Sequence, residues 1–260
     1  CEDADRKELG LSYGQDKVIT ALAKANKNLI VVNISGNAIA MPWVKEVPAI
    51  VQAWYLGSEA GSAIASVLTG DVNPSGKLPF TFPASLQDVG AHKLGEYPGT
   101  PRNYGSPIVD QKYNEGIFVG YRWADKEKTK PLFSFGHGLS YTTFAYGKAI
   151  ADKKVMGQDE TLTITLPVTN TGSREGSEVI QLYISDLKSS LPRPVKELKG
   201  FSKVKLAPGE TREVTFTIGK EALSFFDDAR HEWVAEPGKF EAWIGASSTD
   251  IRNKVAFKLK

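Results

Sequence analysis

The sequence predicts an α/β fold followed by an all-β sandwich. Between residues 15 and 83, helix signals alternate with short apolar strand signals, which is typical of an α/β layer. From about residue 146, runs that alternate with period two are separated by turn residues, which is typical of an immunoglobulin-like sandwich. We therefore expect a partial α/β sandwich, with a mostly parallel sheet and flanking helices, ahead of the β-sandwich.

The first elements are a helix and a buried strand. Residues 15–25 carry Val18, Ile19 and Leu22 at helical spacing, and this pattern predicts an amphipathic helix. Residues 29–34 form a continuous apolar run, which predicts a strand covered on both faces.

A second strand, helix and turn follow. Residues 49–54 predict another buried strand, and Glu59 opens an apolar helix that Gly70 ends. The turn residues 73–76 then lead into a predicted strand at 78–82.

The rest of the chain divides into three segments. Residues 84–113 are rich in Gly, Pro, Asn and Tyr and have no periodicity, so we interpret them as a variable loop within a first domain at 1–113. Residues 114–145 cross to a second domain through two glycine-rich aromatic blocks, which we expect to form short extended pieces. The sandwich covers 146–260. Its predicted strands are 161–166, 179–184, 214–218 and 240–244.

Composition excludes several function classes. The 260 residues are 41% hydrophobic, which is enough for a sizeable core, and the net charge of +2 gives no reason to propose nucleic acid or an anionic membrane as a partner. The longest apolar runs are far shorter than a membrane helix needs. A single cysteine excludes an internal disulfide, and the three histidines have no ligand spacing, so we expect no metal and no cofactor.

The run from Gly57 to Pro83, GSEAGSAIASVLTGDVNPSGKLPFTFP, closely resembles the second domain of family 3 glycoside hydrolases. Further motifs follow in the order of that family: Glu2-x-x-Asp5-Arg6, Ala53-Trp54-Tyr55, Glu115-Gly116 and residues 135–142. Residues 194–201 and 206–211 resemble markers of the fibronectin type III-like domain that ends many of these enzymes. The chain thus resembles the carboxy-terminal portion of a bacterial β-glucosidase of the periplasmic type, which implies a periplasmic or secreted location.

The resemblance implies exo-acting, retaining hydrolysis of terminal non-reducing β-D-glucosyl residues from a β-linked oligosaccharide or glucoside. Such hydrolysis needs a nucleophile and a general acid/base, both carboxyl groups. In the family the nucleophile is an aspartate on a preceding (β/α)8 barrel, which these residues do not resemble. The acid/base glutamate often lies three residues before an Asp-Arg pair, and Glu2 holds that position, although Asp3 stands where the family often has glycine. We expect the chain alone to be inactive, with the barrel as its partner.

Three further residues are weaker candidates for substrate binding. Asp5 and Arg6 are either an ion pair that anchors a loop or charges at the edge of a subsite. Glu115 has four aromatic neighbours, which either form a sugar-stacking wall or fill the crossing between domains while Glu115 braces it. These neighbours are Tyr113, Phe118, Tyr121 and Trp123.

Other functions remain open at this point. A β-xylosidase of the same family is one alternative, and a β-N-acetylglucosaminidase ranks lower because such enzymes often end without the sandwich. A non-catalytic module is another, if Trp233 and Trp243 form an exposed strip that binds polysaccharide. The first half of the α/β domain is not evident in the sequence, so its sheet would have an exposed edge, which favours a partner such as a second copy.

Overall fold

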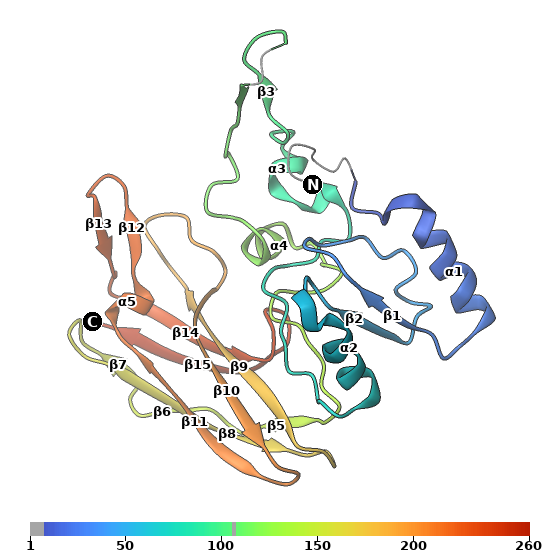
Figure 1. Ribbon diagram of the computed structural model, residues 1–260. Coiled ribbons are helices and arrows are strands. Elements are labelled where there is room, and N and C mark those ends of the chain that lie inside the picture. The colour runs from blue at the N-terminus through green and yellow to red at the C-terminus, as the bar shows by residue number, and fades with distance from the viewer. Residues whose placement is uncertain (1–7, 106–107) are drawn as a thin grey trace.

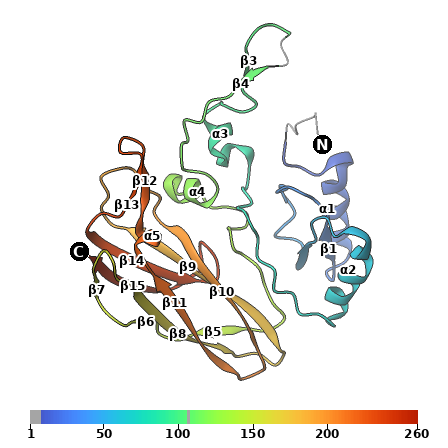
Figure 2. The same ribbon diagram turned by 60° about the vertical axis from the view of Figure 1, so that its left-hand side comes forward.

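The computed structural model describes residues 8–105 and 108–260. A small α/β part and a large β-sandwich lie side by side, and a group of short helices and loops lies near the top of both (Figures 1 and 2). Among the helices of these residues, none is both long enough and apolar enough to cross a bilayer.

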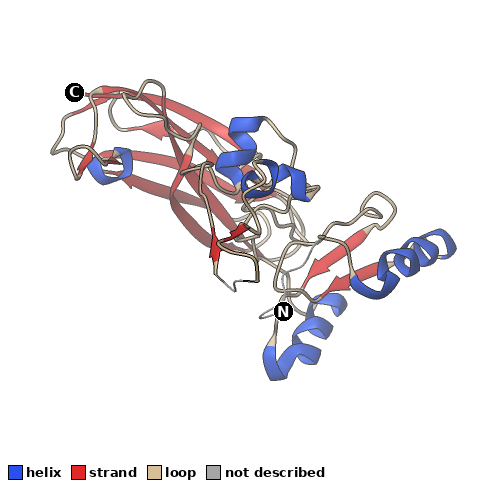
Figure 3. Cartoon of the chain, turned by 90° about the horizontal axis from the view of Figure 1, so that it is seen from above, coloured by secondary structure: helices blue, strands red, loops and turns tan. Residues whose placement is uncertain are grey.

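The α/β part has a two-stranded parallel sheet between two helices. Strand β1 (Ile30–Asn33) pairs with β2 (Ala49–Gln52), with Ile30 opposite Ala49. Helices α1 (Gln15–Ala25) and α2 (Ala60–Thr69) lie on opposite sides of these strands (Figure 3). The predicted helix at 15–25 is confirmed with the same bounds. Gly70 ends α2 at φ 83°, a left-handed conformation that favours glycine.

Two predictions about strands are wrong. The first apolar run is not covered on both faces, since Ile30 is 49% exposed and Ile34 is 59% exposed, because the described sheet has only two strands. Residues 78–82 form no regular strand. They run antiparallel to residues 133–137 instead, and Leu78 exchanges backbone hydrogen bonds of 2.8 Å with Gly136 and His137.

Between the α/β part and the sandwich, the chain forms short elements. A 3-10 turn (Leu86–Asp88), helix α3 (Gly90–Lys93) and the hairpin of β3 (Thr100–Pro101) and β4 (Val109–Asp110) occupy the predicted loop. The hairpin projects from the rest of the molecule (Figures 1 and 2).

Helix α4 (Tyr121–Glu127) is a third correction, because this segment was expected to be extended. Gly120, at φ 61°, turns the chain into the helix. Trp123 is only 4% exposed and packs beside Gly90 of α3, so burial of one large ring overrides the β-type composition of the segment.

The sandwich consists of two sheets. The five-stranded sheet has the order β10-β9-β14-β15-β7, and the four-stranded sheet has the order β11-β8-β5, with β6 also pairing with β8. All these pairs are antiparallel except β15 with β7. The strands are β5 (Phe144–Tyr146), β6 (Ile150–Ala151), β7 (Val155–Met156), β8 (Leu162–Asn170), β9 (Gly176–Asp186), β10 (Glu197–Leu206), β11 (Thr211–Ile218), β14 (Gly238–Gly245) and β15 (Ile251–Leu259). A short helix, α5 (Lys220–Leu223), and the hairpin of β12 (Phe225–Asp227) and β13 (Glu232–Val234) lie at one end.

The four predicted strands of the sandwich are confirmed as parts of β8, β9, β11 and β14, except that β8 begins at Leu162, one residue after the predicted start. Their alternation reflects one buried face: Leu162, Ile164 and Leu166 of β8 are all fully buried. Each such side chain contributes about 1.5–3 kcal/mol by leaving water, so this face is the main source of sandwich stability.

Polar side chains join the α/β part to the sandwich. The Asn73 side chain donates to the carbonyl of Glu175 at 2.9 Å and accepts from the backbone N–H of Tyr141 at 2.8 Å. Lys77 donates to the carbonyl of Gly138 and forms a buried ion pair with Glu178 of β9 at 3.4 Å.

Candidate functional site

The three residues of the Glu2 motif, Glu2, Asp5 and Arg6, lie outside the described residues, so their roles stay predictions. The segment that follows them is held in place. The carbonyl of Leu9 accepts from the backbone N–H of Ala40 at 2.9 Å, in the loop after β1. This contact ties the segment that follows the motif to the edge of the α/β part.

Asp16 is a second anchor of this segment. Its Oδ2 accepts from the backbone N–H of Leu11 at 3.1 Å, and its Oδ1 accepts from Nε1 of Trp43 at 2.7 Å. Trp43 is fully buried, so Asp16 connects the segment to the core. Sequence reasoning missed Asp16, because nothing in its local pattern reveals a partner 27 residues away.

A polar cluster lies where the parallel strands β1 and β2 end. The Asn33 amide donates to Oγ of Ser35 at 3.1 Å and also to the side chain of Gln52, whose own amide donates to the carbonyl of Ser35 at 3.2 Å. In open α/β sheets, ligands bind beyond the carboxyl ends of the strands. Here the polar groups bind one another, and they fix the start of the loop that contacts Leu9.

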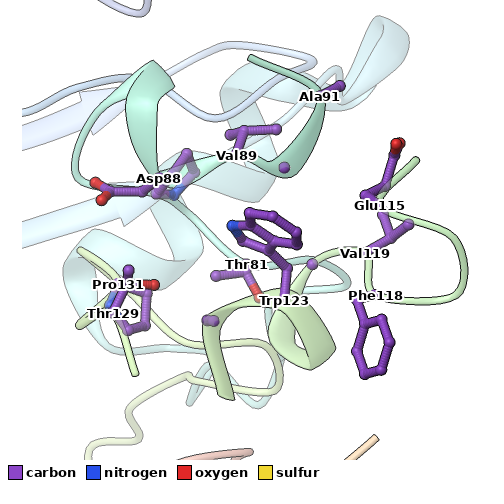
Figure 4. A pocket seen from close by; sticks show the side chains of 14 residues that line it. Thr81, Asp88, Val89, Ala91, Glu115, Phe118, Val119, Trp123, Thr129 and Pro131 are labelled. Carbon is purple, nitrogen blue, oxygen red and sulfur yellow. The ribbon is translucent and has the colours of Figure 1, made fainter. Parts of the chain in front are cut away.

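Glu115 lies in the loop before α4 and is 8% exposed. It lines a cavity of about 250 Å³ together with Phe118 and Trp123 (Figure 4). The predicted aromatic wall is therefore only half formed. Tyr113 is 73% exposed, and Tyr121 packs against Phe135 and Tyr183 at the sandwich, with ring centroids 5.1 and 5.9 Å apart.

The alternative role for Glu115, as a brace between domains, is not supported by its contacts. Its Oε2 is buried and has no hydrogen-bond partner within the described residues. Tyr121 takes the bracing role instead, since its hydroxyl accepts from the backbone N–H of Leu198 in β10 at 2.9 Å.

The described residues contain no candidate metal-binding site. Within residues 8–105 and 108–260, no group of three or more His, Cys, Asp or Glu side chains could hold a metal ion.

Comparison with known families yields two matches. Residues 1–141 match the glycosyl hydrolase family 3 C-terminal domain, and residues 178–248 match a fibronectin type III-like domain.

Curated relatives match nearly the whole chain. Beta-glucosidase BoGH3A of Bacteroides ovatus is 54% identical over 260 residues, which cover 99% of this chain and 34% of that protein. Thermostable beta-glucosidase B of Acetivibrio thermocellus is 41% identical over 252 residues, covering 96% of this chain and 32% of that protein. The chain thus spans about a third of the length of these relatives.

Solved structures agree in fold. DesR, a beta-glucosidase from Streptomyces venezuelae in complex with D-glucose, matches all of this chain with a TM-score of 0.89 and 40% identity. The beta-glucosidase from Kluyveromyces marxianus in complex with glucose matches 98% of it with a TM-score of 0.88 and 41% identity. The chain covers 32% and 30% of those two proteins, respectively.

Proposed function

The chain belongs to glycosyl hydrolase family 3, and from this premise we propose that it supplies the general acid/base of an exo-acting, retaining β-glucosidase. The observation that carries the proposal is 54% identity to a β-glucosidase along 99% of the chain. In this proposal the nucleophile comes from a barrel domain outside these 260 residues, as in the family that the motifs resemble.

Glu2 is the proposed acid/base. Its carboxylic acid would donate a proton to the glycosidic oxygen as the bond to the aglycone breaks, and its carboxylate would then take a proton from the water that attacks the glycosyl-enzyme. Two features support this choice: the position of Glu2 before Asp5-Arg6, and the anchoring of the next segment through Leu9 and Asp16. Asp5 and Arg6 would hold the loop or contact the sugar.

The test compares two nearby glutamates in a protein that joins this chain to a family 3 barrel. We expect Glu2→Ala to slow hydrolysis of an alkyl β-glucoside by roughly 10²–10⁴-fold, the usual contribution of a general acid/base. Glu8→Ala, at an exposed glutamate in the same segment, should leave the rate unchanged. Equal rates for Glu2→Ala and the parent protein would remove Glu2 from the mechanism.

A second candidate function is carbohydrate binding by the sandwich. Trp233 is 67% exposed and packs edge-on against Phe226, which is 44% exposed, with centroids 5.8 Å apart on the β12–β13 hairpin. Trp243 does not extend this pair into a strip, because Lys254 lies 3.4 Å from its ring centroid and covers it. The test measures retention of the parent chain and of Trp233→Ala on insoluble glucan. Retention of the parent that the substitution abolishes would favour this function. Equal recovery of the parent and the variant in the wash would exclude it.

The proposal also covers the sugar specificity of the enzyme, its cellular location and its oligomeric state. Glucose is favoured over xylose by the names of the relatives, and assays with paired aryl β-glucoside and β-xyloside substrates would distinguish the two enzymes. A periplasmic or secreted location and a homo-oligomer are proposed from the family resemblance and the narrow described sheet. Cell fractionation and light scattering test them.

A further inference from the structure

The projecting hairpin of β3 and β4 carries large apolar side chains in solvent. Tyr104 is completely exposed, Tyr113 at the base of the hairpin is 73% exposed, and Val109 is 45% exposed. We call these three side chains the hairpin surface. The hairpin stands away from both the α/β part and the sandwich (Figures 1 and 2). A two-stranded hairpin is only marginally stable by itself in water, and exposed apolar side chains gathered on one element indicate an interaction surface.

The base of the hairpin is tightly built. The Glu96 carboxylate accepts from the backbone N–H of Asn114 at 3.0 Å and also from its side-chain amide. The side-chain amide of Gln111 donates to the carbonyl of Glu96 at 2.6 Å. A Cβ added to Gly99 would lie 2.5 Å from Cγ1 of Val109, which shows how closely the two arms approach. These contacts fix the direction in which the hairpin leaves the molecule, so its surface is preorganised for binding.

The charges on the two arms neutralise each other. The Arg102 guanidinium pairs with the Asp110 carboxylate of the opposite arm at 2.7 Å, and the backbone N–H of Arg102 donates to the carbonyl of Ile108 at 3.0 Å. The hairpin surface therefore presents two aromatic rings and an aliphatic side chain beside an internally paired charge. An apolar, uncharged protein surface complements it, whereas a polyanion would find no net positive charge on this pair.

The size of the hairpin surface favours a partner within the same polypeptide. A buried aromatic side chain removes roughly 150–250 Å² from water, so the three side chains would bury roughly 500 Å². Two copies joined through this surface would bury about 1,000 Å², which is less than the roughly 1,200–2,000 Å² of stable interfaces. A covalently joined partner has an effective concentration in roughly the millimolar range, so a small contact is enough to hold it.

The relatives contain such a partner. Residues 1–141 match the C-terminal domain of the family, and about two thirds of each of the two curated relatives lies outside the part that this chain covers. The first described residues, ahead of α1, lie on the same upper side of the molecule as the hairpin in both views (Figures 1 and 2). A domain joined ahead of this chain would therefore meet the chain on the side from which the hairpin projects.

We propose that the hairpin surface docks on an apolar face of the preceding part of the family 3 enzyme and fixes that part against the α/β part. The proposal rests on the proposed function for the identity of this partner, the barrel. It goes beyond that function because it assigns a structural contact to Tyr104, Val109 and Tyr113, and this contact requires no catalytic role of Glu2.

The test measures hydrogen exchange of the hairpin amides, residues 100–105 and 108–113, by mass spectrometry. It compares this chain alone with a protein that joins it to a family 3 barrel. Exchange follows the population of the open form, so a hairpin that is docked nine-tenths of the time should exchange roughly tenfold more slowly in the joined protein. The turn at residues 207–210, at the opposite end of the sandwich, should exchange equally in both proteins.

Two variants connect the protection to the hairpin surface. Tyr104→Ser and Tyr113→Ser should each raise exchange in the joined protein to the rate of the chain alone, and neither should change exchange in the chain alone. Lys112→Ser, at the exposed lysine next to Tyr113, should keep the protection. These two matched positions separate the loss of an aromatic contact from a change at any exposed residue of the arm.

Three results would overturn the proposal. These are equal exchange of the hairpin in the two proteins, protection that survives both tyrosine substitutions, and protection of the chain alone that grows with its concentration, which would identify a second copy as the occupant. The assay involves no hydrolysis, and Glu2→Ala in the joined protein should leave the hairpin protected. Failure of this proposal is thus distinguishable from failure of the acid/base assignment.

Discussion

Gly136 shows why the block of residues 135–142 contains glycine at a fixed place. Its φ of 80° is left-handed, and a Cβ there would come closer than 3.0 Å to three atoms of the Gln181 side chain. Gln181 cannot move away easily, because its amide donates to the carbonyls of Gly136 at 3.1 Å and Ala246 at 2.8 Å. Close packing of residues 135–142 on β9 thus explains why this motif has glycine at position 136.

We predict that Gly136→Ala lowers the free energy of unfolding by roughly 3 kcal/mol, the sum of left-handed strain and overpacking. Urea denaturation measures the change. The matched control is Gly61→Ala in α2, where an added Cβ meets nothing within 4 Å and should stabilise the protein by about 0.5–1 kcal/mol. Equal stabilities for the two variants would contradict the packing account.

Lys196 is a buried cation with one carboxylate and several rings around it. Its side chain is 4% exposed, it donates to Asp125 of α4 at 2.5 Å, and it lies 6.0 Å or less from the centroids of Tyr121, Tyr183 and Trp243. Burial raises the pKa of Asp125, and the hydrogen bond and charge of Lys196 oppose that rise. This ion pair fastens α4 to the sandwich.

Lys196→Met should destabilise the protein by roughly 3 kcal/mol at pH 7, because it leaves the Asp125 carboxylate buried without its partner. Without the ammonium, the pKa of Asp125 in the folded variant rises further above 3.8. The folded variant then keeps a proton that the unfolded chain releases, so its stability falls as the pH rises from about 4 toward 7.

The measurement is the difference in unfolding free energy between the parent and Lys196→Met, taken at several pH values. We expect that difference to grow with pH and to shrink in the double variant Lys196→Met/Asp125→Asn. A loss that is independent of pH would show that packing around Lys196, rather than its charge, holds α4 in place.

At the scale of elements, the hydrophobic periodicity predicted correctly those helices and strands whose formation depends on their own residue pattern. The helix at 15–25 and the sandwich strands follow from periodicity. The strands bury one face, whereas the helix packs Ile19 and Ala23 inward and leaves Val18 57% and Leu22 49% exposed. Residues 78–82 and 121–127 were predicted wrongly, because contacts distant in sequence decide them. Leu78 pairs with residues 136–137, and Trp123 packs against Gly90.

The Asn73 turn is the element that joins the two most recognisable motifs. Its side-chain oxygen accepts from the hydroxyl of Ser140 at 2.9 Å and the backbone N–H of Tyr141, and its amide reaches Glu175 in the sandwich. We predict that Asn73→Ala costs roughly 3 kcal/mol, about 1 kcal/mol for each of three hydrogen bonds. Asn103→Ala, at an exposed position near the projecting hairpin, should change the unfolding midpoint in urea little. Matching midpoints for the two variants would argue against a joining role.

At the scale of the whole molecule, the family and the order of the two folds were predicted from motifs and are confirmed by both family matches. The candidate site was predicted less completely. Glu115 was singled out from its aromatic neighbours, but no pattern could indicate that Thr81, 34 residues away, lines the same cavity. Asp16 and Lys196 were missed for the same reason, since their partners are fixed only by the tertiary fold.

The central claim, that Glu2 is the acid/base of a retaining β-glucosidase, is tested most directly by azide rescue. Azide attacks a glycosyl-enzyme without help from a general base, so it can replace the water that Glu2 would activate. The measurement is the product formed from an activated aryl β-glucoside by Glu2→Ala, joined to a family 3 barrel, in the presence of azide. We predict restored turnover with glucosyl azide of β configuration. Turnover that azide does not change, with glucose as the product, would contradict the account.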